Sequence, residues 1–191
     1  MPARHQYGFT LIELMVAVAV LLILAVIAVP SFTSYLDKAR VRGAADSVVN
    51  VIAQARQGGV KHDRDVSLAI TGVDGTWCIG ANQAVDPAAG SLSPGALACD
   101  CTDADECVVD NERLVVASSG HPGVTLTSPS GDMTFDGRLG VRSDANTADA
   151  NASSFDLTSK SGRFVLTVRV SPLGQATVCS KAGNILGYPQ C

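Results

Sequence analysis

The sequence is poor in the side chains on which most enzyme chemistry depends. Its 191 residues include only three histidines, and aromatic residues make up 5% of the chain. General acid–base catalysis relies most often on histidine, so few candidates exist for a catalytic pair. The sequence contains no Gly-x-Ser-x-Gly, no phosphate-binding loop and no His-Glu-x-x-His motif. It therefore predicts a protein that is not an enzyme and that needs no cofactor.

The chain also lacks a strong charge of either sign. Its formal net charge is −4 at pH 7, and it has a single tryptophan, Trp77. Nucleic-acid-binding domains are typically basic, and binders of single strands stack bases on aromatic side chains. This composition argues against nucleic acid as the main partner. No internal repeat interrupts the sequence, which favours one globular domain.

What the sequence does have is a long apolar run near its start. Residues 9–29 are apolar except for Thr10 and Glu13. At about 1.5 Å per residue this run reaches roughly 30 Å, the thickness of the hydrocarbon core of a bilayer. A plain membrane anchor explains the length but not the carboxylate. A charge in a membrane segment is costly, about 2.5–3.5 kcal/mol at the centre, and usually marks function.

The residues around the run resemble the N-terminus of type IV pilins and of type II secretion pseudopilins. The short leader 1–8 carries Arg4 and ends in Gly8, ahead of the apolar run rather than behind it. The resemblance implies that a prepilin peptidase cleaves after Gly8 and methylates Phe9. It implies that Glu13 pairs with an N-terminal amine and sets subunit register during assembly. It also implies that Pro30 kinks the helix, since proline removes a backbone donor.

A second helical pattern follows over 31–60, the amphipathic half of the helix. Apolar residues recur at three- and four-residue steps, and the opposite face is polar. Gly58-Gly59 is expected to end the helix. A basic cluster of Lys38, Arg40 and Arg42 follows the apolar run. Solvated charge explains it, and lipid headgroups or acidic faces of neighbouring subunits are the alternatives. The expected stripe consists of Phe32, Tyr35, Leu36, Ala39, Val41, Ala44, Ala45, Val48, Val49, Ile52, Ala53 and Ala55.

From residue 61 to the C-terminus, short β-prone runs alternate with turn residues. The expected strands are 66–70, 76–79, 113–116, 124–127, 133–135, 154–158, 164–170 and 175–179, with surface links at 81–98 and 142–153. The last two strands are separated by Ser171-Pro172-Leu173-Gly174, which favours a tight hairpin. The chain is thus expected to comprise a leader (1–8), a transmembrane helix (9–30), the amphipathic half (31–60) and a β-rich globular domain (61–191).

Six cysteines all lie beyond the apolar run, and an even number in an exported domain favours disulfides. Cys179 and Cys191 flank a short tail, where a bridge would pin the C-terminus. The other four cysteines, Cys78, Cys99, Cys101 and Cys107, allow three pairings, and the sequence does not choose among them. Zinc at these cysteines is a weaker alternative without added histidine. Calcium at Asp103-Ala-Asp105 or Asp144-Ala-Asn146 is another alternative, although neither loop completes a calcium-hand pattern. No metal site is predicted.

The C-terminal half resembles the GspH/FimT family. The resemblance rests on Phe135-Asp-Gly137-Arg-Leu-Gly140, on Phe155-Asp-Leu157, and on the run from Phe164 to Gly174. The cysteines resemble those of the minor pilins FimT and FimU more than those of the pseudopilin GspH. The implied fold is α+β: a long N-terminal helix, half membrane-spanning and half amphipathic, packed on an antiparallel two-sheet β-sandwich with a disulfide-closed C-terminal loop.

Some FimT relatives bind DNA through Gly-Arg-x-Arg at the last hairpin. The matching positions here read Gly174-Gln175-Ala176-Thr177, so both arginines are missing. Each lost arginine removes a phosphate contact, and DNA is disfavoured as a partner. Arg163 and Arg169 are expected on one face of the preceding strand, with Lys181 nearby, as the remaining candidates for DNA contact.

Taken together, the residues and the two resemblances predict a minor type IV pilin. The expected role is structural: to prime pilus assembly or sit at the pilus tip, supporting pilus biogenesis and twitching motility. The expected partners are other minor pilins and pilus subunits, prepilin peptidase and inner-membrane lipid. The chain is expected to wait in the bacterial inner membrane as a single-pass protein with a periplasmic globular part, and later to reach the surface pilus. The alternatives are a type II secretion pseudopilin and a DNA-binding pilin of natural transformation.

Overall fold

The computed structural model describes residues 9–72, 74–84, 99–101, 103, 105–127, 132–143 and 153–191. The chain divides into two compact units, Met1–Leu36 and Asp37–Cys191, and we call the second unit the headpiece. Helix α1 (Leu11–His62) contributes residues to both units. The expected leader 1–8, with Gly8, lies outside the described residues.

In the first unit, α1 buries almost nothing. Its large apolar side chains between positions 11 and 29 are 50–77% exposed. Phe32 and Tyr35 are also exposed, at 61% and 66%, so the prediction that they join a buried stripe was wrong. These two side chains fall in the first unit, whose described residues contribute nothing to the buried core. The helix continues through residue 30, so it is not broken there, and the kink at Pro30 stays a prediction.

In the headpiece, the same helix is amphipathic. Its buried residues recur at three- and four-residue steps, which places them on one face. Ala39 and Ala53 were expected on this face but are exposed, whereas Val51 is buried instead. The stripe is therefore narrower than predicted and starts only inside the headpiece. It consists of Val41, Ala44, Ala45, Val48, Val51, Ile52 and Ala55.

The end of α1 differs from the prediction. Gly58 and Gly59 do not stop the helix, which runs on to His62. Asp63 then adopts a positive φ of 52°, and the Arg64 N–H donates to the Gly59 carbonyl at 3.1 Å, as in a Schellman cap. Gly58 serves packing instead, because a Cβ there would collide with the Val109 side chain.

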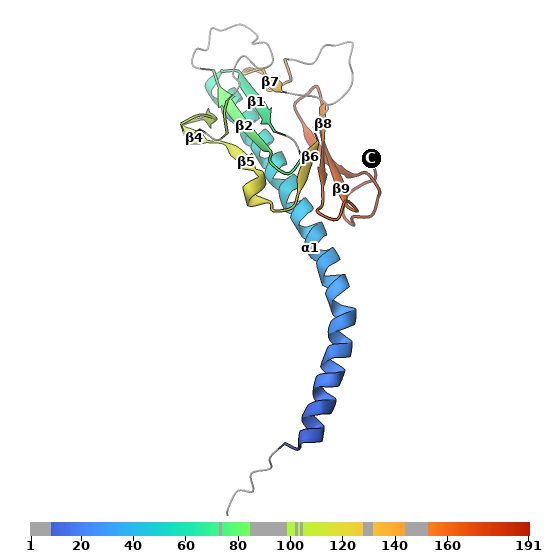
Figure 1. The fold of residues 1–191 in the computed structure, drawn as a ribbon. Coiled ribbons are helices and arrows are strands. Elements are labelled where there is room, and N and C mark those ends of the chain that lie inside the picture. The colour runs from blue at the N-terminus through green and yellow to red at the C-terminus, as the bar shows by residue number, and fades with distance from the viewer. Residues whose placement is uncertain are drawn as a thin grey trace, which may run out of the picture. The chain divides into compact units, whose positions relative to one another are not determined.

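The headpiece contains two four-stranded antiparallel sheets and a short hairpin (Figure 1). The first sheet has the order β5-β2-β1-β7, formed by Val115–Ala117, Cys78–Gln83, Val66–Thr71 and Met133–Phe135. The second has the order β10-β9-β8-β6, formed by Ala176–Ser180, Val165–Val170, Ser153–Thr158 and Thr125–Thr127. The hairpin pairs β3 (Val108–Val109) with β4 (Glu112–Arg113), and a 3₁₀ turn, η1, covers Ser118–Gly120.

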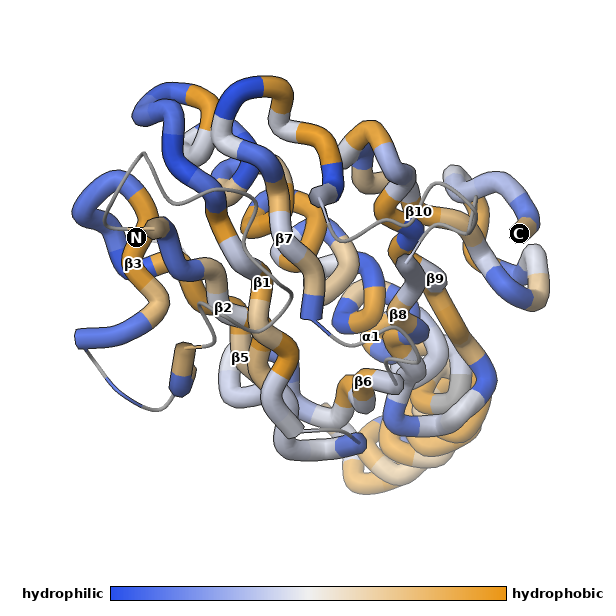
Figure 2. The backbone as a smooth tube through the Cα atoms, turned by 90° about the horizontal axis from the view of Figure 1, so that it is seen from above, coloured by the Kyte–Doolittle hydropathy of each residue, from blue (hydrophilic) through white to orange (hydrophobic). Residues whose placement is uncertain are grey.

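Both sheets share one apolar core with α1. Figure 2, viewed from above, shows β1, β2 and β5 on one side of the helix and β8, β9 and β10 on the other. Val66 and Leu68 of β1, Phe155 and Leu157 of β8, and Val48 of α1 all belong to this core. Strand β8 alternates between buried and half-buried residues, because successive side chains point to opposite faces of a sheet. The predicted α+β class, a long helix with antiparallel sheets, is confirmed.

The β2 strand departs from its predicted position. It was expected at 76–79, with a surface link from residue 81, but it spans Cys78–Gln83. Its antiparallel register with β1, from Val66↔Gln83 to Thr71↔Cys78, sets these limits. Pairing with β1 therefore extends the β2 strand into residues that the sequence indicated as part of a polar surface loop. The β3–β4 hairpin was only partly expected, since 113–116 was predicted as one strand.

Candidate functional site

The start of α1 is closed by a capping box formed by Thr10 and Glu13. The Thr10 backbone N–H and hydroxyl each lie 3.3 Å from Oε2 of Glu13, and the Glu13 N–H donates to the Thr10 hydroxyl oxygen at 3.3 Å. This reciprocal pair satisfies two donors that a helix end otherwise leaves unpaired. The signal Thr-x-x-Glu before an apolar run was readable in the sequence, so Thr10 is a functional candidate that the sequence reasoning missed.

The cap fixes the Glu13 carboxylate within the first turn of the helix. Both hydrogen bonds to the carboxylate use Oε2, so within the described residues Oε1 is available to another donor. Phe9, one turn away, is 88% exposed. The predicted cleavage site at Gly8 lies outside the described residues, and the roles of Phe9 and Glu13 in assembly stay predictions.

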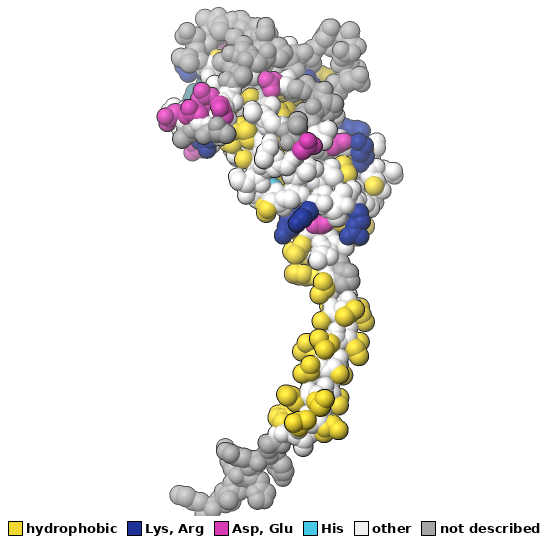
Figure 3. Space-filling model, in the orientation of Figure 1, with side chains coloured by type: hydrophobic (Ala, Val, Ile, Leu, Met, Phe, Trp, Pro, Cys, Tyr) yellow, Lys and Arg dark blue, Asp and Glu magenta, His cyan; other side chains and the backbone are white. Residues whose placement is uncertain are grey.

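The apolar run after this cap forms a continuous exposed surface (Figure 3). Within the described residues, α1 contains one stretch long and apolar enough to cross a membrane, judged by length and composition. Exposed contiguous apolar surface of this kind marks contact with lipid or protein. The segment is therefore suited to contact with lipid or with another protein surface.

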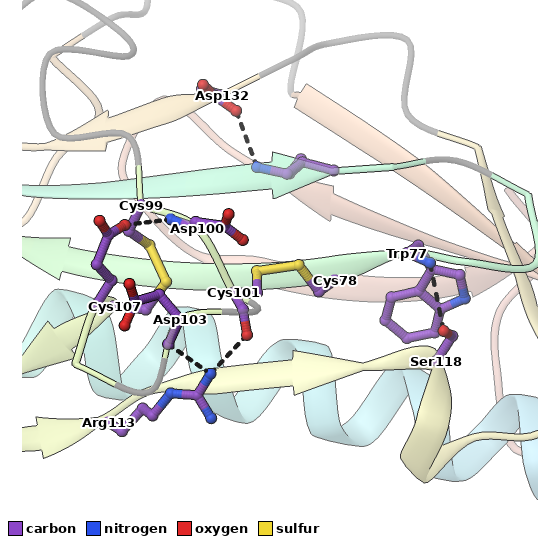
Figure 4. The surroundings of a disulfide bond; sticks show 12 residues. Trp77, Cys78, Cys99, Asp100, Cys101, Asp103, Cys107, Arg113, Ser118 and Asp132 are labelled. Atoms are coloured by element: carbon purple, nitrogen blue, oxygen red, sulfur yellow. Dashed lines mark hydrogen bonds between the residues drawn. A yellow bond between two sulfur atoms is a disulfide. The ribbon is translucent and has the colours of Figure 1, made fainter.

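In the headpiece, all six cysteines form disulfides: Cys78–Cys101, Cys99–Cys107 and Cys179–Cys191. The first two lie together over the outer face of the first sheet (Figure 4). A Cβ on Gly80 of β2 would meet the Sγ atoms of Cys99 and Cys107, so this position needs a glycine. With α1 on the other face, the disulfides explain why the first four residues of β1 are all buried.

The acidic segment between these cysteines makes hydrogen bonds of its own. Arg113 donates to the Cys101 and Asp103 carbonyls at 2.6 and 2.9 Å, and Asp103 accepts from the Asp105 N–H. The Glu106 carboxylate accepts from the Asp100 N–H. Disulfide pairing removes the thiolates that zinc needs. In the described part of the chain, no three His, Cys, Asp or Glu side chains are placed to hold a metal ion; Asp144 and Asn146 lie outside it.

The third disulfide holds the C-terminal tail on the edge of β10. Cys179 is the fourth residue of this strand, and Ser180 pairs with Gln190 in a parallel bridge. The Ser180 N–H donates to the Pro189 carbonyl at 2.8 Å, and the Cys191 N–H donates to the Ser180 carbonyl at 3.2 Å. The tail thus covers one end of an edge strand, which would otherwise present unpaired backbone groups.

The glycines of the GspH/FimT-like motif hold two turns against α1. A Cβ on Gly137 would collide with the Arg64 backbone, and one on Gly174 (φ 74°) would collide with the Gly140 carbonyl. Arg56 of α1 donates from Nε to that same Gly140 carbonyl at 2.8 Å. The motif therefore marks a packing junction between the end of the helix, the turn after β7 and the turn between β9 and β10.

Beside this junction lies an apolar groove of about 700 Å³. Val49, Ala53 and Val60 of α1 line one wall, and Leu139 and Gly174–Thr177 line the other. Its two cations are engaged, Arg56 with Gly140 and Lys61 with Asp110. The groove is apolar where phosphate recognition would need free cations.

The three residues considered for DNA contact do not form one basic face. Arg163 precedes β9 and does not lie on this strand. Strand alternation therefore cannot align Arg163 with Arg169, and the prediction that both lie on one face of the strand was wrong. Arg163 stands instead over the Phe164 ring, 5.7 Å from its centroid. Lys181 is 2.7 Å from the Asp156 carboxylate.

Asp156 lies among these cations on the second sheet. Desolvation raises the pKa of its carboxyl, but hydrogen bonds from Lys181 and Thr167 and the charges of Lys181 and Arg169 outweigh it, and the pKa falls below its ordinary value. The Asp156 carboxylate therefore stays ionised and partly neutralises the charges of Lys181 and Arg169. This surface is less suited to DNA than the sequence alone indicated.

The architecture so far defines a class: an exposed, capped apolar helix that continues into a disulfide-linked α+β headpiece. A family model of the prokaryotic N-terminal methylation motif matches residues 3–29. The fimbrial protein of Moraxella nonliquefaciens is 42% identical over 72 residues, which are 36% of this chain and 47% of that protein. A fimbrial protein of Pseudomonas aeruginosa is 35% identical over 77 residues, 40% of this chain and 49% of that protein.

The chain spans about half the length of these curated relatives. A solved structure, the type IV minor pilin FimU of Pseudomonas aeruginosa strain PAO1, has a TM-score of 0.46 and 12% identity, over 75% of this chain and 91% of that chain. The motif match confirms the predicted type IV pilin N-terminus. Together with the apolar helix, it gives the chain the features of a membrane-anchored pilin, and the relatives are named as fimbrial proteins rather than as enzymes.

Proposed function

We propose that this chain is a minor type IV pilin, a non-enzymatic subunit of the complex that primes pilus assembly or sits at the pilus tip. Prepilin peptidase would cleave it after Gly8 and methylate Phe9, and the subunit would wait in the inner membrane. The observation that carries the proposal is the match of the methylation motif to residues 3–29, a segment in which Glu13 lies in the first turn of an exposed apolar helix.

In this proposal, Glu13 has two tasks that use different oxygens. Oε2 accepts from Thr10 and holds the end of the helix together, which lowers the number of unpaired donors in the membrane. Oε1 is left for the N-terminal amine of a neighbouring subunit. A carboxylate in lipid costs about 2.5–3.5 kcal/mol at the bilayer centre, and pairing with that amine offsets the cost only after assembly. The charge thus favours the assembled state over the waiting one.

Three variants separate the cap from the charge. Glu13→Gln keeps a capping side chain and removes the charge, Thr10→Val removes the hydroxyl's two bonds of the cap and keeps the charge, and Glu13→Ala removes both the charge and the capping side chain. We expect all three to insert in the membrane, and we expect the two Glu13 variants to lose at least ten times more surface pili than Thr10→Val. Equal losses in Glu13→Gln and Thr10→Val would show that capping, not charge pairing, is the role of this residue.

A deletion strain scored for pili, twitching, secretion and transformation tests the cellular role. Loss of pili and twitching together supports the minor pilin. Intact pili with failed protein secretion would replace the proposal with a pseudopilin. Intact pili with failed transformation would replace it with a DNA receptor, in spite of the missing arginines at Gln175 and Thr177.

A further inference from the structure

One end of the headpiece gathers cations from segments far apart in the sequence. Lys38, Arg40 and Arg42 come from the part of α1 that enters the headpiece, and Arg163 comes from the turn between β8 and β9. The Lys38 Nζ lies 4.9 Å from the centroid of the Phe164 ring, and the Arg163 guanidinium carbon lies 5.7 Å from the same centroid. Two cations therefore flank one aromatic ring and cannot be far apart. Figure 3 shows Lys and Arg side chains at the lower end of the headpiece.

The C-terminal loop closed by Cys179–Cys191 reaches the same end. Arg42 donates to the Leu186 carbonyl, and its guanidinium carbon lies 5.9 Å from the centroid of the Tyr188 ring. The Leu186 side chain is 87% exposed, more than any other large apolar side chain of the headpiece that the structure describes. An exposed apolar side chain beside a group of cations is typical of protein surfaces that bind a membrane interface.

The charge balance at this end differs from that of the whole chain. Asp37 and Asp46 are the carboxylates on the same part of α1, so three cations there (Lys38, Arg40, Arg42) outnumber two anions, although the chain carries −4 overall. The ion pairs among the described residues engage Lys61, His62, Arg138 and Lys181, and none of them engages Lys38, Arg40 or Arg42. Among the described residues, Lys38 faces the Phe164 ring, and Arg42 faces the Leu186 carbonyl and the Tyr188 ring, so neither is in an ion pair there.

Chain connectivity sets where this end can lie. Exposed Phe32 and Tyr35 extend the apolar surface to within three residues of Lys38. Aromatic residues favour the membrane–water boundary, and at about 1.5 Å per residue Lys38 lies only about 4–5 Å along the helix from Tyr35. The cations on α1 therefore follow the apolar segment directly along the chain.

We propose that the Lys38–Arg40–Arg42–Arg163 end of the headpiece, with Leu186, docks on the anionic phospholipid surface of the membrane in which the apolar segment is anchored. Lipid phosphates would bind the cations, and Leu186 would enter the acyl boundary. Docking would hold an unassembled subunit against the bilayer, and extraction into a filament would release it. This inference rests on the proposed membrane anchor, and it goes beyond the proposed pilin role.

The test uses the full chain in lipid nanodiscs with Leu186→Trp as a reporter, since this exposed site tolerates a larger side chain. Brominated lipid quenches tryptophan only at contact, and the buried Trp77 gives the unquenched baseline. We expect quenching of the reporter in phosphatidylglycerol discs, little in phosphatidylcholine discs, and loss at about 1 M salt, where the Debye length is about 3 Å. Incorporation into either disc checks the anchor independently of docking.

Charge variants complete the test. Arg40→Gln, at an exposed site with no ion pair among the described residues, should shift the docked-to-undocked ratio about fivefold, which corresponds to about 1 kcal/mol per cation at an anionic surface. Arg138→Gln is the matched control, because Arg138 is 80% exposed and pairs with Asp63 at another part of the headpiece. Equal quenching in both lipids, or none in either, would overturn the proposal. Binding of duplex DNA that depends on Arg40 and Arg163 without any lipid dependence would overturn it in favour of a nucleic-acid surface.

Discussion

Residues 11–36 and 37–62 belong to one helix, yet they present apolar side chains in opposite ways. The first part exposes them on all sides, whereas the second buries a single stripe against two sheets. The first part has a capping box at its start, whereas the headpiece has a core and three disulfides. One continuous helix can thus serve two environments, because its sequence changes from apolar all round to amphipathic.

The largest expected effect comes from placing the same charge in both parts. Val48 is fully buried in the headpiece core, and Val18 is 50% exposed in the apolar run. Val48→Asp should destabilise the headpiece by more than about 4 kcal/mol, because it buries an unpaired carboxylate. Val18→Asp should leave the headpiece melting temperature unchanged and impair membrane insertion.

Thermal melting in detergent, with a membrane fractionation of the same variants, distinguishes the two effects. A fall in melting temperature for Val18→Asp would mean that the apolar segment contributes to headpiece stability. The two regions would then not be independent in the way the burial pattern indicates.

Removing one disulfide at a time tests how two regions of the headpiece, the first sheet and the C-terminal tail, differ in their contribution to stability. Replacing Cys99 and Cys107 by Ala should cost about 2–5 kcal/mol, since the bridge covers Gly80 and one face of the first sheet. Replacing Cys179 and Cys191 should free the tail and weaken lipid docking by Leu186 as well. Chemical denaturation of the oxidised pair variants measures the losses of stability, and quenching of the Leu186→Trp reporter in nanodiscs measures docking. A larger loss of stability from the C-terminal pair would contradict the view that the first-sheet cluster is part of the core.

Much of this contrast was readable from sequence, because hydrophobic periodicity is a local property. The apolar run, the amphipathic pattern and the second sheet's β8, β9 and β10 all fall close to their predicted positions. The pairing of Cys78 with Cys101 was not readable, since it depends on how β2 packs under a distant segment. The end of α1 was predicted at the wrong residue for a similar reason. Glycine is typical of a helix C-terminal cap, but Gly58 instead allows close contact with Val109.

The candidate functional residues were predicted unevenly, because some follow from local sequence patterns and others arise only from tertiary packing. Glu13 stands out in the sequence because a charge in an apolar run is unusual, and Thr10 was overlooked although its spacing to Glu13 is that of a capping box. Arg163 was assigned to a strand by extending alternation past the first residue of β9. Its position beside Lys38 arises from tertiary packing around Phe164, which no local pattern reports.

Acid should weaken the headpiece through Asp156. Its pKa is lowered in the folded state, so its contribution to stability is present above the ordinary carboxyl pKa of about 3.8 and is lost as pH falls through the lowered value. Asp156→Asn should therefore cost about 1 kcal/mol at neutral pH and nothing at strongly acidic pH. Melting curves across this range, compared with those of Asp46→Asn as a control for a general charge effect, check the prediction. A constant difference at all pH values would mean that packing, not ionisation, carries the effect.

The smallest expected effect comes from two glycines within the headpiece part of α1. A Cβ on Gly43 meets no atom within 4 Å, whereas one on Gly58 meets Val109. Gly43→Ala should stabilise the headpiece by about 0.5–1 kcal/mol, because alanine loses less backbone entropy in a helix, and raise its melting temperature by about 1–4 °C. Gly58→Ala carries the same entropic gain but must displace Val109, so it should be neutral or destabilising. If both variants gained stability equally, the Val109 side chain would move aside easily, and close packing would not explain the glycine at position 58 of the helix.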